Sequence, residues 1–308
     1  MSSRLFLSSG DLMADRRFDF ARDLQLTGDL PAAADLLSQA IELVPNFTSA
    51  WFTLGGIREE LGEHRAAIAA YQKAQASDPA DRHGAGLRLM RLGAEPVAGM
   101  PQAYVQTLFD QYAPRFEASL VGDLGYRGPA LLFKAVLSVR SAARKPTFFK
   151  RAIDLGCGTG LAATAFARSV DHFIGVDLSP RMIERARATS LYAELEVADM
   201  LQGLRARQDA SVDLVLAADA MVYVAELAPL LAEASRVLAS DGLLAFTAET
   251  HGGEGVVIGQ GLRYAHAAGY VRDAVDSAGL GLALLENLSA RNEDHAPVPG
   301  LVAIAAKT

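Results

Sequence analysis

Residues Ile153 to Gly160 read IDLGCGTG, a short apolar strand pattern that enters three glycines at alternate positions. A helical pattern follows, over residues 161–168. Glycine permits positive φ and close approach of a ligand to the backbone, and the start of a helix offers free N–H groups. The dinucleotide fingerprint G-x-G-x-x-G does not fit, because its third glycine would fall on Leu161. The stretch therefore predicts a ligand-binding turn that does not bind NAD.

Strand and helix patterns alternate from this stretch to the end of the chain. The predicted strands are residues 152–155, 172–177, 195–198, 212–217, 242–247, 282–288 and 301–306. Helices are predicted over residues 161–168, from Ser179-Pro180 onward, over 227–238 and over 270–278. Such alternation predicts a mostly parallel sheet with helices on both faces.

Acidic residues stand at the ends of the first three predicted strands. Asp154 precedes the first glycine, Asp177 ends the second strand, and Asp199 follows the third. An open α/β sheet binds ligands at the carboxyl ends of its strands, where an acid often holds a ribose diol. Each acid alone could equally be a helix N-cap or a solvated loop charge. Three acids in register around one glycine turn predict a nucleoside ligand with an amino-acid tail.

The first third of the chain repeats with a period of 34 residues, as Gly28 and Gly62, Ala40 and Ala74, and other pairs show. Small residues at this period are the signature of tetratricopeptide repeats. We therefore expect a small all-α repeat domain over residues 1–97, and a second domain over residues 98–308. The repeats could form a groove for a peptide or protein. They could equally be a structural cap or a surface for self-association.

The composition of the chain argues against several other classes of function. The formal net charge is −7, and the basic runs are short, which disfavours nucleic acid as a partner. A single cysteine, Cys157, excludes an internal disulfide, and no thiolate or histidine cluster indicates a metal site. No apolar stretch has the length of a membrane span, and the start is not a secretory signal. We expect a cytoplasmic protein without membrane or metal.

The glycine stretch, the acids and the late strands together resemble the class I S-adenosylmethionine (SAM)-dependent methyltransferases, from about residue 105 onward. The resemblance implies a Rossmann-like, seven-stranded α/β sheet whose last strand is antiparallel, and SAM as the cofactor. It implies a glycine cradle for the methionine end, an acid for the ribose, an acid for the adenine amino group, and a further acid near the reactive methyl. The residues placed at the cofactor are Asp154, Gly156, Cys157, Gly158, Gly160, Asp177, Leu178, Asp199, Met200 and Asp219.

The whole chain is similar to a narrower group, the predicted bacterial methyltransferases with N-terminal tetratricopeptide repeats. FDQYAPRF at residues 109–116, the turn at 125–127 and RYAH at 263–266 carry this similarity. In the methyltransferases that this chain resembles, an aromatic helix before the glycine strand covers the cofactor. Within the helical pattern over residues 103–120, residues 104–116 are therefore expected to form an aromatic lid, since aromatic faces stabilise a sulfonium. An ordinary amphipathic core helix is the alternative. The lid residues assigned to the cofactor are Tyr104, Tyr112 and Phe116, with Phe109 near the same face.

Residues 250–270 are expected to face the methyl acceptor. The glycine-rich part, residues 252–261, predicts a mobile connection after the fifth strand. His266 is the first candidate for a general base, and Arg263 could clamp a substrate carboxylate through two parallel hydrogen bonds. Surface or core roles are the alternative for both. The remaining candidates are Tyr264 and Asp219 for catalysis, His251 and Tyr223 for substrate binding, and, more weakly, His295.

These residues predict methyl transfer to oxygen or nitrogen of a small metabolite, and Arg263 favours an acidic one. A protein methyltransferase that recruits its target through the repeats is the first alternative. A non-catalytic SAM-binding scaffold is the second, and the intact glycine turn with its three acids argues against it. No Asn-Pro-Pro-Tyr motif follows the fourth strand, where Asp219-Ala220-Met221-Val222 stands instead, so amino-group methylation of DNA bases or glutamine is disfavoured.

Overall fold

A computed structural model describes residues 5–116, 125–293 and 295–307. The chain divides into two compact units, Met1–Leu108 and Phe109–Thr308. The division falls inside helix α6 (Gln102–Tyr112), whereas the sequence predicts a boundary after residue 97. Residues 94–101, on either side of this predicted boundary, lie outside any helix or strand. None of the described helices is long and apolar enough to cross a membrane.

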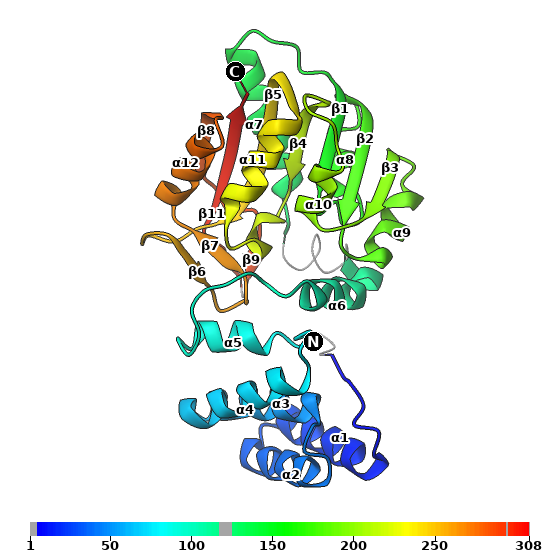
Figure 1. The fold of residues 1–308 in the computed structure, drawn as a ribbon, viewed down its shortest axis with the longest axis vertical. Coiled ribbons are helices and arrows are strands. Elements are labelled where there is room, and N and C mark those ends of the chain that lie inside the picture. The colour runs from blue at the N-terminus through cyan, green and yellow to red at the C-terminus, as the bar shows by residue number, and fades with distance from the viewer. Residues whose placement is uncertain (1–4, 117–124, 294, 308) are drawn as a thin grey trace. The chain divides into compact units, whose positions relative to one another are not determined.

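The first unit consists of helices that pack in succession along the chain (Figure 1). They are α1 (Leu12–Thr27), α2 (Leu30–Leu43), α3 (Thr48–Glu60), α4 (His64–Ser77) and α5 (Ala85–Arg91), followed by the start of α6. Gly28 ends α1 with φ 88°, and Gly62 follows α3 with φ 76°, so the two glycines serve equivalent turns. Gly55 of α3 lies against the Tyr71 ring of α4, where a Cβ would stand 2.6 Å from the ring. The 34-residue period thus matches equivalent turns between successive helices.

The second unit is a sheet with helices on both faces (Figure 1). Its strands are β1 (Phe149–Leu155), β2 (Val170–Asp177), β3 (Tyr192–Val197), β4 (Val212–Ala217), β5 (Leu238–Glu249), β6 (Val256–Ile258), β7 (Tyr264–His266), β8 (Gly281–Asn287), β9 (Asn292–Glu293), β10 (Ala296–Pro297) and β11 (Gly300–Ala306). Its helices are η1 (Ala113–Arg115), α7 (Gly128–Ala142), α8 (Leu161–Phe166), α9 (Pro180–Ala188), α10 (Met200–Arg205), η3 (Met221–Tyr223), α11 (Leu227–Val237) and α12 (Ala268–Ser277).

The main path of the sheet has the strand order β3-β2-β1-β4-β5-β11-β8. The pairs β1–β2, β1–β4, β2–β3 and β4–β5 are parallel, and β11 is antiparallel to both β5 and β8. This confirms the prediction of a mostly parallel, Rossmann-like sheet with an antiparallel last strand. The main path has the predicted seven strands, and β6 and β7 add two more, so the described sheet has nine. The carboxyl ends of β1, β2, β4 and β5 consequently lie along one edge, where a ligand can contact several loops.

Two apolar clusters enclose the sheet, one on each face. The first packs Ile153, Leu155 and Val215 against α10, α11 and α12. The second packs Ala152, Leu214 and Leu216 against α7 and α8. Strand residues alternate between the faces, so neighbours in β1 and β4 enter different clusters. The carboxyl-end loops are therefore carried on a core that is buried on both sides.

Several predicted elements agree closely with the structure. The fourth strand spans the predicted residues 212–217. Ser179 is the N-cap of α9, accepting from the Met182 N–H, and Pro180 opens the helix. The predicted helix over residues 103–120 is described as α6 and η1, and its residues 117–120 lie outside the described residues.

Part of the predicted mobile connection over residues 252–261 forms a strand, β6. β6 and β7 form an antiparallel pair with Val257 opposite Ala265 and Ile258 opposite Tyr264, and β7 also pairs in parallel with β5. The glycines dominated the sequence pattern, whereas the short apolar segments on either side of them form the strands. All three residues of β7 are buried, so this hairpin is fixed to the sheet.

Candidate functional site

The glycine turn joins β1 to α8, and all three of its glycines have positive φ. The φ angles are 64° at Gly156, 53° at Gly158 and 96° at Gly160. A Cβ on Gly156 would stand 2.8 Å from the Cβ of Ala220, in the loop after β4. Positive φ strains any residue with a side chain. The turn therefore requires glycine, and it lies directly beside the end of β4.

Asp154 lies at the end of β1 and is 1% exposed. The Tyr192 hydroxyl donates to its Oδ2 at 2.7 Å, while its buried Oδ1 has no hydrogen-bond partner among the described residues. Burial raises the pKa of Asp154 to about 7. A buried carboxylate oxygen without a donor is costly unless a ligand supplies one. Asp154 can thus receive a cationic donor, such as the ammonium group of an amino acid.

The Tyr192 ring reaches Asp154 because Gly175 of β2 leaves room for it. A Cβ on Gly175 would stand 2.8 Å from the ring. Sequence reasoning missed Tyr192, which comes from the start of β3, three residues before the strand that the sequence predicts. The only local signal is a glycine within the apolar run of β2.

Asp177 ends β2 and contacts the glycine turn. Its Oδ2 accepts from the Gly158 N–H at 2.9 Å, and its Oδ1 accepts from the Ser179 N–H at 2.8 Å. Burial raises its pKa to about 6. The Ser179 hydroxyl in turn donates to Oδ1 of Asp110 in α6 at 2.5 Å. Asp177 therefore couples the glycine turn, α9 and the C-terminal half of α6, with Leu178 half-buried beside it.

Asp199 is the N-cap of α10, the alternative that the sequence left open for each acid. Its Oδ1 accepts from the Leu201 N–H at 2.9 Å. The next residue, Met200, places its Sδ 4.0 Å from the position of a Cβ on Gly156. Met200 thus lies at the glycine turn. Cys157, within the turn, is buried against Ile183 and Ala186, as expected of a packing residue.

Aromatic side chains cover the glycine turn. The Phe116 ring lies 3.7 Å from the position of a Cβ on Gly158. Phe109 contacts Phe116 and also Tyr223 of η3, with ring centroids 6.2 and 5.3 Å apart, and Tyr112 contacts Phe116 at 6.5 Å. Tyr104 belongs to the first unit, where its ring lies 2.8 Å from the position of a Cβ on Gly84. The structure thus brings Phe109, Tyr112, Phe116 and Tyr223 together at the turn.

A network of five charged side chains lies beyond the turn, at the ends of β4 and β5. Arg291 is 2% exposed and binds Asp219 with its Nη1, Glu249 with its Nη2 and Glu293 with its Nε. Arg263 binds Glu249 with its Nε at 2.7 Å and Glu293 with its Nη2. Burial raises the pKa of Asp219. We name these residues, Asp219, Glu249, Arg263, Arg291 and Glu293, the charge network.

Sequence reasoning identified Asp219 and Arg263 but not the other three members of the charge network. Glu249 ends β5, and Arg291 and Glu293 come from the segment after β8, so no local spacing joins them. The structure corrects the expectation that Arg263 offers its guanidinium to a substrate carboxylate. Two internal carboxylates already occupy it, because Glu249 and Glu293 flank it in the folded chain.

His266 and His251, which the sequence predicts to act on the methyl acceptor, contact other groups of the protein itself. His266 is fully buried, contacts the Val224 carbonyl oxygen through Nε2 at 2.9 Å, and stacks on Tyr270. Burial lowers its pKa. His251 contacts Gly255 and Gly253 within its own turn, and His295 is exposed with φ 64°. Tyr264 is fully buried, and burial raises its pKa to about 12. These positions favour structural roles for His266, His251 and Tyr264, whereas His295 lies on the surface.

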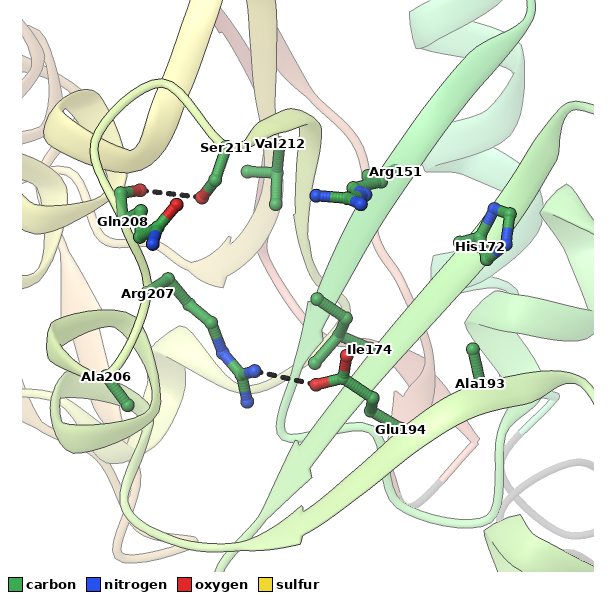
Figure 2. A pocket seen from close by; sticks show the side chains of 10 residues that line it. All are labelled: Arg151, His172, Ile174, Ala193, Glu194, Ala206, Arg207, Gln208, Ser211 and Val212. Atoms are coloured by element: carbon green, nitrogen blue, oxygen red, sulfur yellow. Dashed lines mark hydrogen bonds and ion pairs between the residues drawn. The ribbon is translucent and has the colours of Figure 1, made fainter.

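A shallow cavity opens at the opposite end of the sheet (Figure 2). Arg151, His172, Glu194, Arg207 and Val212 are among its lining residues, and they come from the amino-terminal halves of β1 to β4 and the loop after α10. Arg207 is paired with Glu194 across it. The cavity includes none of the residues predicted for cofactor, catalysis or substrate, and it is separate from the glycine turn.

The sheet order and the glycine turn define the Rossmann-like fold of class I SAM-dependent methyltransferases. Residues 153–246 match the protein family described as a methyltransferase domain. The match begins within β1, ends within β5, and includes the glycine turn and the acids at the ends of β1 to β4. These comparisons support a SAM-dependent methyltransferase domain with SAM as its cofactor.

Two curated relatives and one solved structure are similar to parts of the chain. Human methyltransferase-like protein 27 is 31% identical over 46% of this chain and 57% of that protein. A ubiquinone biosynthesis O-methyltransferase of Xylella fastidiosa is 29% identical over 42% of this chain and 55% of that protein. The chain thus spans little more than half the length of these curated relatives.

The solved structure is 1,6-didemethyltoxoflavin-N1-methyltransferase of Burkholderia thailandensis, with S-adenosylhomocysteine bound. It aligns with a TM-score of 0.50 and 18% identity, over 70% of this chain and 92% of that chain. At this identity the likeness concerns the fold.

Proposed function

We propose that this chain transfers the methyl group of SAM to oxygen or nitrogen of a small molecule. The observation that carries the proposal is Asp154, a buried carboxylate with one oxygen unpartnered, beside a turn of three positive-φ glycines. SAM presents an ammonium group next to a carboxylate, and a nucleoside beyond them. NAD presents a pyrophosphate at the equivalent turn, and Asp154 would repel it.

The residues around the turn have distinct roles in this proposal. Asp154 holds the ammonium group, and Gly156, Gly158 and Gly160 allow the backbone to lie against the methionine end. Asp177 holds the ribose hydroxyls, Asp199 the adenine amino group, and Leu178 and Met200 pack beside the base. When bound, SAM supplies a methyl group on a positively charged sulfur.

The aromatic cluster supports this arrangement. Phe116 lies against Gly158, and Phe109, Tyr112 and Tyr223 gather around it, so these rings are available to attract a sulfonium and to exclude water. Methyl transfer needs the acceptor aligned with the methyl group, and fixed geometry supplies much of the rate. A general base is needed only for an acceptor whose proton has a high pKa. The buried positions of His266 and Tyr264 make them poor candidates for that role.

We further propose that helices α1 to α4 are two tetratricopeptide repeats. The equivalent turns at Gly28 and Gly62 and the close contact of Gly55 with Tyr71 support this assignment. Repeats of this kind bind a peptide segment or a second copy of the chain. Light scattering of the purified chain would test self-association, and a monomer at all concentrations would contradict it.

Calorimetric titration tests the cofactor assignment. The purified chain should bind SAM and S-adenosylhomocysteine, and NAD should give no heat. Asp154→Asn should weaken SAM binding by about tenfold or more, the scale of a lost charge-assisted hydrogen bond. Asp273→Asn, at an exposed position of α12, is the matched control and should change nothing. Tight NAD binding without SAM binding would contradict the proposal.

A further inference from the structure

The charge network contains more acidic than basic side chains. Three carboxylates, Asp219, Glu249 and Glu293, surround two guanidiniums, so the five groups together carry one net negative charge when ionised. Arg291 has a carboxylate on each of its three nitrogens, and Arg263 on two of its three. An entering carboxylate would therefore compete with internal carboxylates that are already bound.

Two carboxylate oxygens of the network remain available as acceptors. Both arginine contacts of Glu249 use its Oε1, and both contacts of Glu293 also use Oε1. Among the described residues, neither Oε2 has a hydrogen-bond partner. Glu293 has a side chain that is 37% exposed, whereas Glu249 is 16% exposed. The network can thus accept hydrogen bonds from a ligand at its outer side without breaking an ion pair.

The network adjoins the cofactor turn through Asp219, and the aromatic rings lie at the same turn. Asp219 precedes Ala220, whose Cβ lies against Gly156. On the other side, Tyr223 contacts Phe109, and Phe109 contacts Phe116 over Gly158. We expect an acceptor that lies beside Asp219 to meet these aromatic rings together with Glu249 and Glu293. Aromatic faces and carboxylates together are the surroundings that recognise an organic cation.

We propose that the methyl acceptor carries an ammonium group, which Oε2 of Glu249 and Oε2 of Glu293 receive. The inference rests on the proposed function and adds the charge class of the acceptor. It replaces the acidic metabolite expected from Arg263 alone. Arg291 is a positioning residue in this arrangement, because it holds Asp219, Glu249 and Glu293 in place without contacting the ligand itself.

Tritiated methyl transfer into a cell extract tests the charge class directly. Small molecules of a bacterial extract are separated into cation-exchange-retained, neutral and anion-exchange-retained fractions. Each fraction is then incubated with the full chain and SAM labelled in its methyl group. The cation-exchange-retained fraction should take up label at least about tenfold faster than the anionic fraction, since a like charge meets a net repulsion.

Two glutamate variants test whether the preference for cationic acceptors depends on the charge network. Glu293→Gln keeps the shape of the side chain and should slow labelling at low extract concentration by about two- to fivefold, the scale of one partly exposed charge. Saturating extract should restore most of the rate, because the change affects acceptor binding. Glu286→Gln, at an exposed position of β8 outside the network, should leave labelling unchanged.

Calorimetry with SAM separates this inference from the proposed function. Both variants should bind SAM as the unchanged chain does. Preferred labelling of the anionic fraction, no labelling of any fraction by a chain that binds SAM, or full labelling by Glu293→Gln would each overturn the inference. Failure of the unchanged chain to bind SAM would overturn the proposed function, and the inference with it.

Discussion

Tyr192 hydrogen-bonds to Asp154 across β2, with 2.7 Å between its hydroxyl oxygen and Oδ2. The two residues lie on strands that are not neighbours, since β2 separates β1 from β3. Gly175 leaves the space between them. The bond lowers the pKa of Asp154, whereas burial raises it more strongly. Tyr192 therefore adjusts the charge of the residue that we assign to the SAM ammonium group.

Tyr192→Phe should weaken SAM binding at pH 7 by about five- to tenfold, the scale of a hydrogen bond to a charged group. Loss of the hydroxyl leaves the Asp154 carboxylate less stabilised, so its pKa rises further. Titration calorimetry at pH 6, 7 and 8, about one unit on either side of the Asp154 pKa of about 7, measures the effect. The loss of SAM affinity caused by Tyr192→Phe should be smallest at the highest pH. An equal deficit at all three values would show that Tyr192 acts through packing.

SAM binding should strengthen as the pH rises through about 7, because the carboxylate form of Asp154 binds the ammonium group. Below that pH the affinity should fall by up to about tenfold per unit, and more steeply once Asp177, with a pKa of about 6, is protonated. In Asp154→Asn, the change of SAM affinity with pH near 7 should be absent. A flat profile between pH 6 and 8 would contradict the assignment.

The free energy of unfolding of the SAM-free chain should decrease as the pH rises, whereas its affinity for SAM increases. A raised pKa means that the folded state favours the protonated acid. The contribution of Asp154 is therefore fully present below its unfolded pKa of about 3.8 and is lost as the pH rises through about 7. Urea titrations of the unchanged chain and of Asp154→Asn, from pH 5 to 8, should diverge as the pH increases. Parallel curves would contradict the prediction.

Gly156→Ala should lower the stability by about 1–3 kcal/mol and also weaken SAM binding. The position has φ 64°, and the new Cβ would meet the Cβ of Ala220 at 2.8 Å. Gly269→Ala is the control, since a Cβ there contacts nothing within 4 Å and φ is not positive. Thermal melting with and without SAM measures both effects. Equal melting temperatures of the two variants would show that the turn tolerates a side chain.

Arg291→Met should lower the stability by about 3–5 kcal/mol, because it leaves buried carboxylates without their partner. Combining it with Asp219→Asn should recover part of the loss, since one unpaired charge disappears. Arg272→Met, at an exposed position of α12, should have little effect. Urea unfolding at pH 7 gives all these values. A double variant that is less stable than Arg291→Met would contradict the ion-pair explanation.

A chain that begins at Ala98 should still bind SAM. It keeps all of α6, the glycine turn and every acid assigned to the cofactor, and the residues from Phe109 onward form a compact unit. Calorimetry on this shortened chain, compared with the full chain, measures the difference. A shortened chain that folds by circular dichroism but does not bind SAM would show that the first unit contributes to the site.

The local parts of this site could be predicted from the sequence, and the long-range parts could not. The glycine spacing and the acids at strand ends are local sequence features, so the position of Gly156, Asp154 and Asp177 at one turn could be predicted from neighbouring residues alone. Arg291 pairs with Asp219, 72 residues earlier in the chain, and no periodic pattern relates the two. The segment after β5 misled the prediction because its glycines outweighed the three-residue strands β6 and β7. Burial of His266 likewise depends on tertiary packing.

The strand order also determines when the sheet can be completed during synthesis. β11 is made after β8 but lies between β5 and β8, and in the described sheet it is the strand that joins them. Until the ribosome has released Gly300–Ala306, both neighbours expose an unpaired edge. The helical unit emerges first and can fold while the sheet is still open, since domains generally fold as units in order of synthesis. A nascent chain stalled before β11 would therefore present sheet edges to chaperones although its helical unit could already be folded.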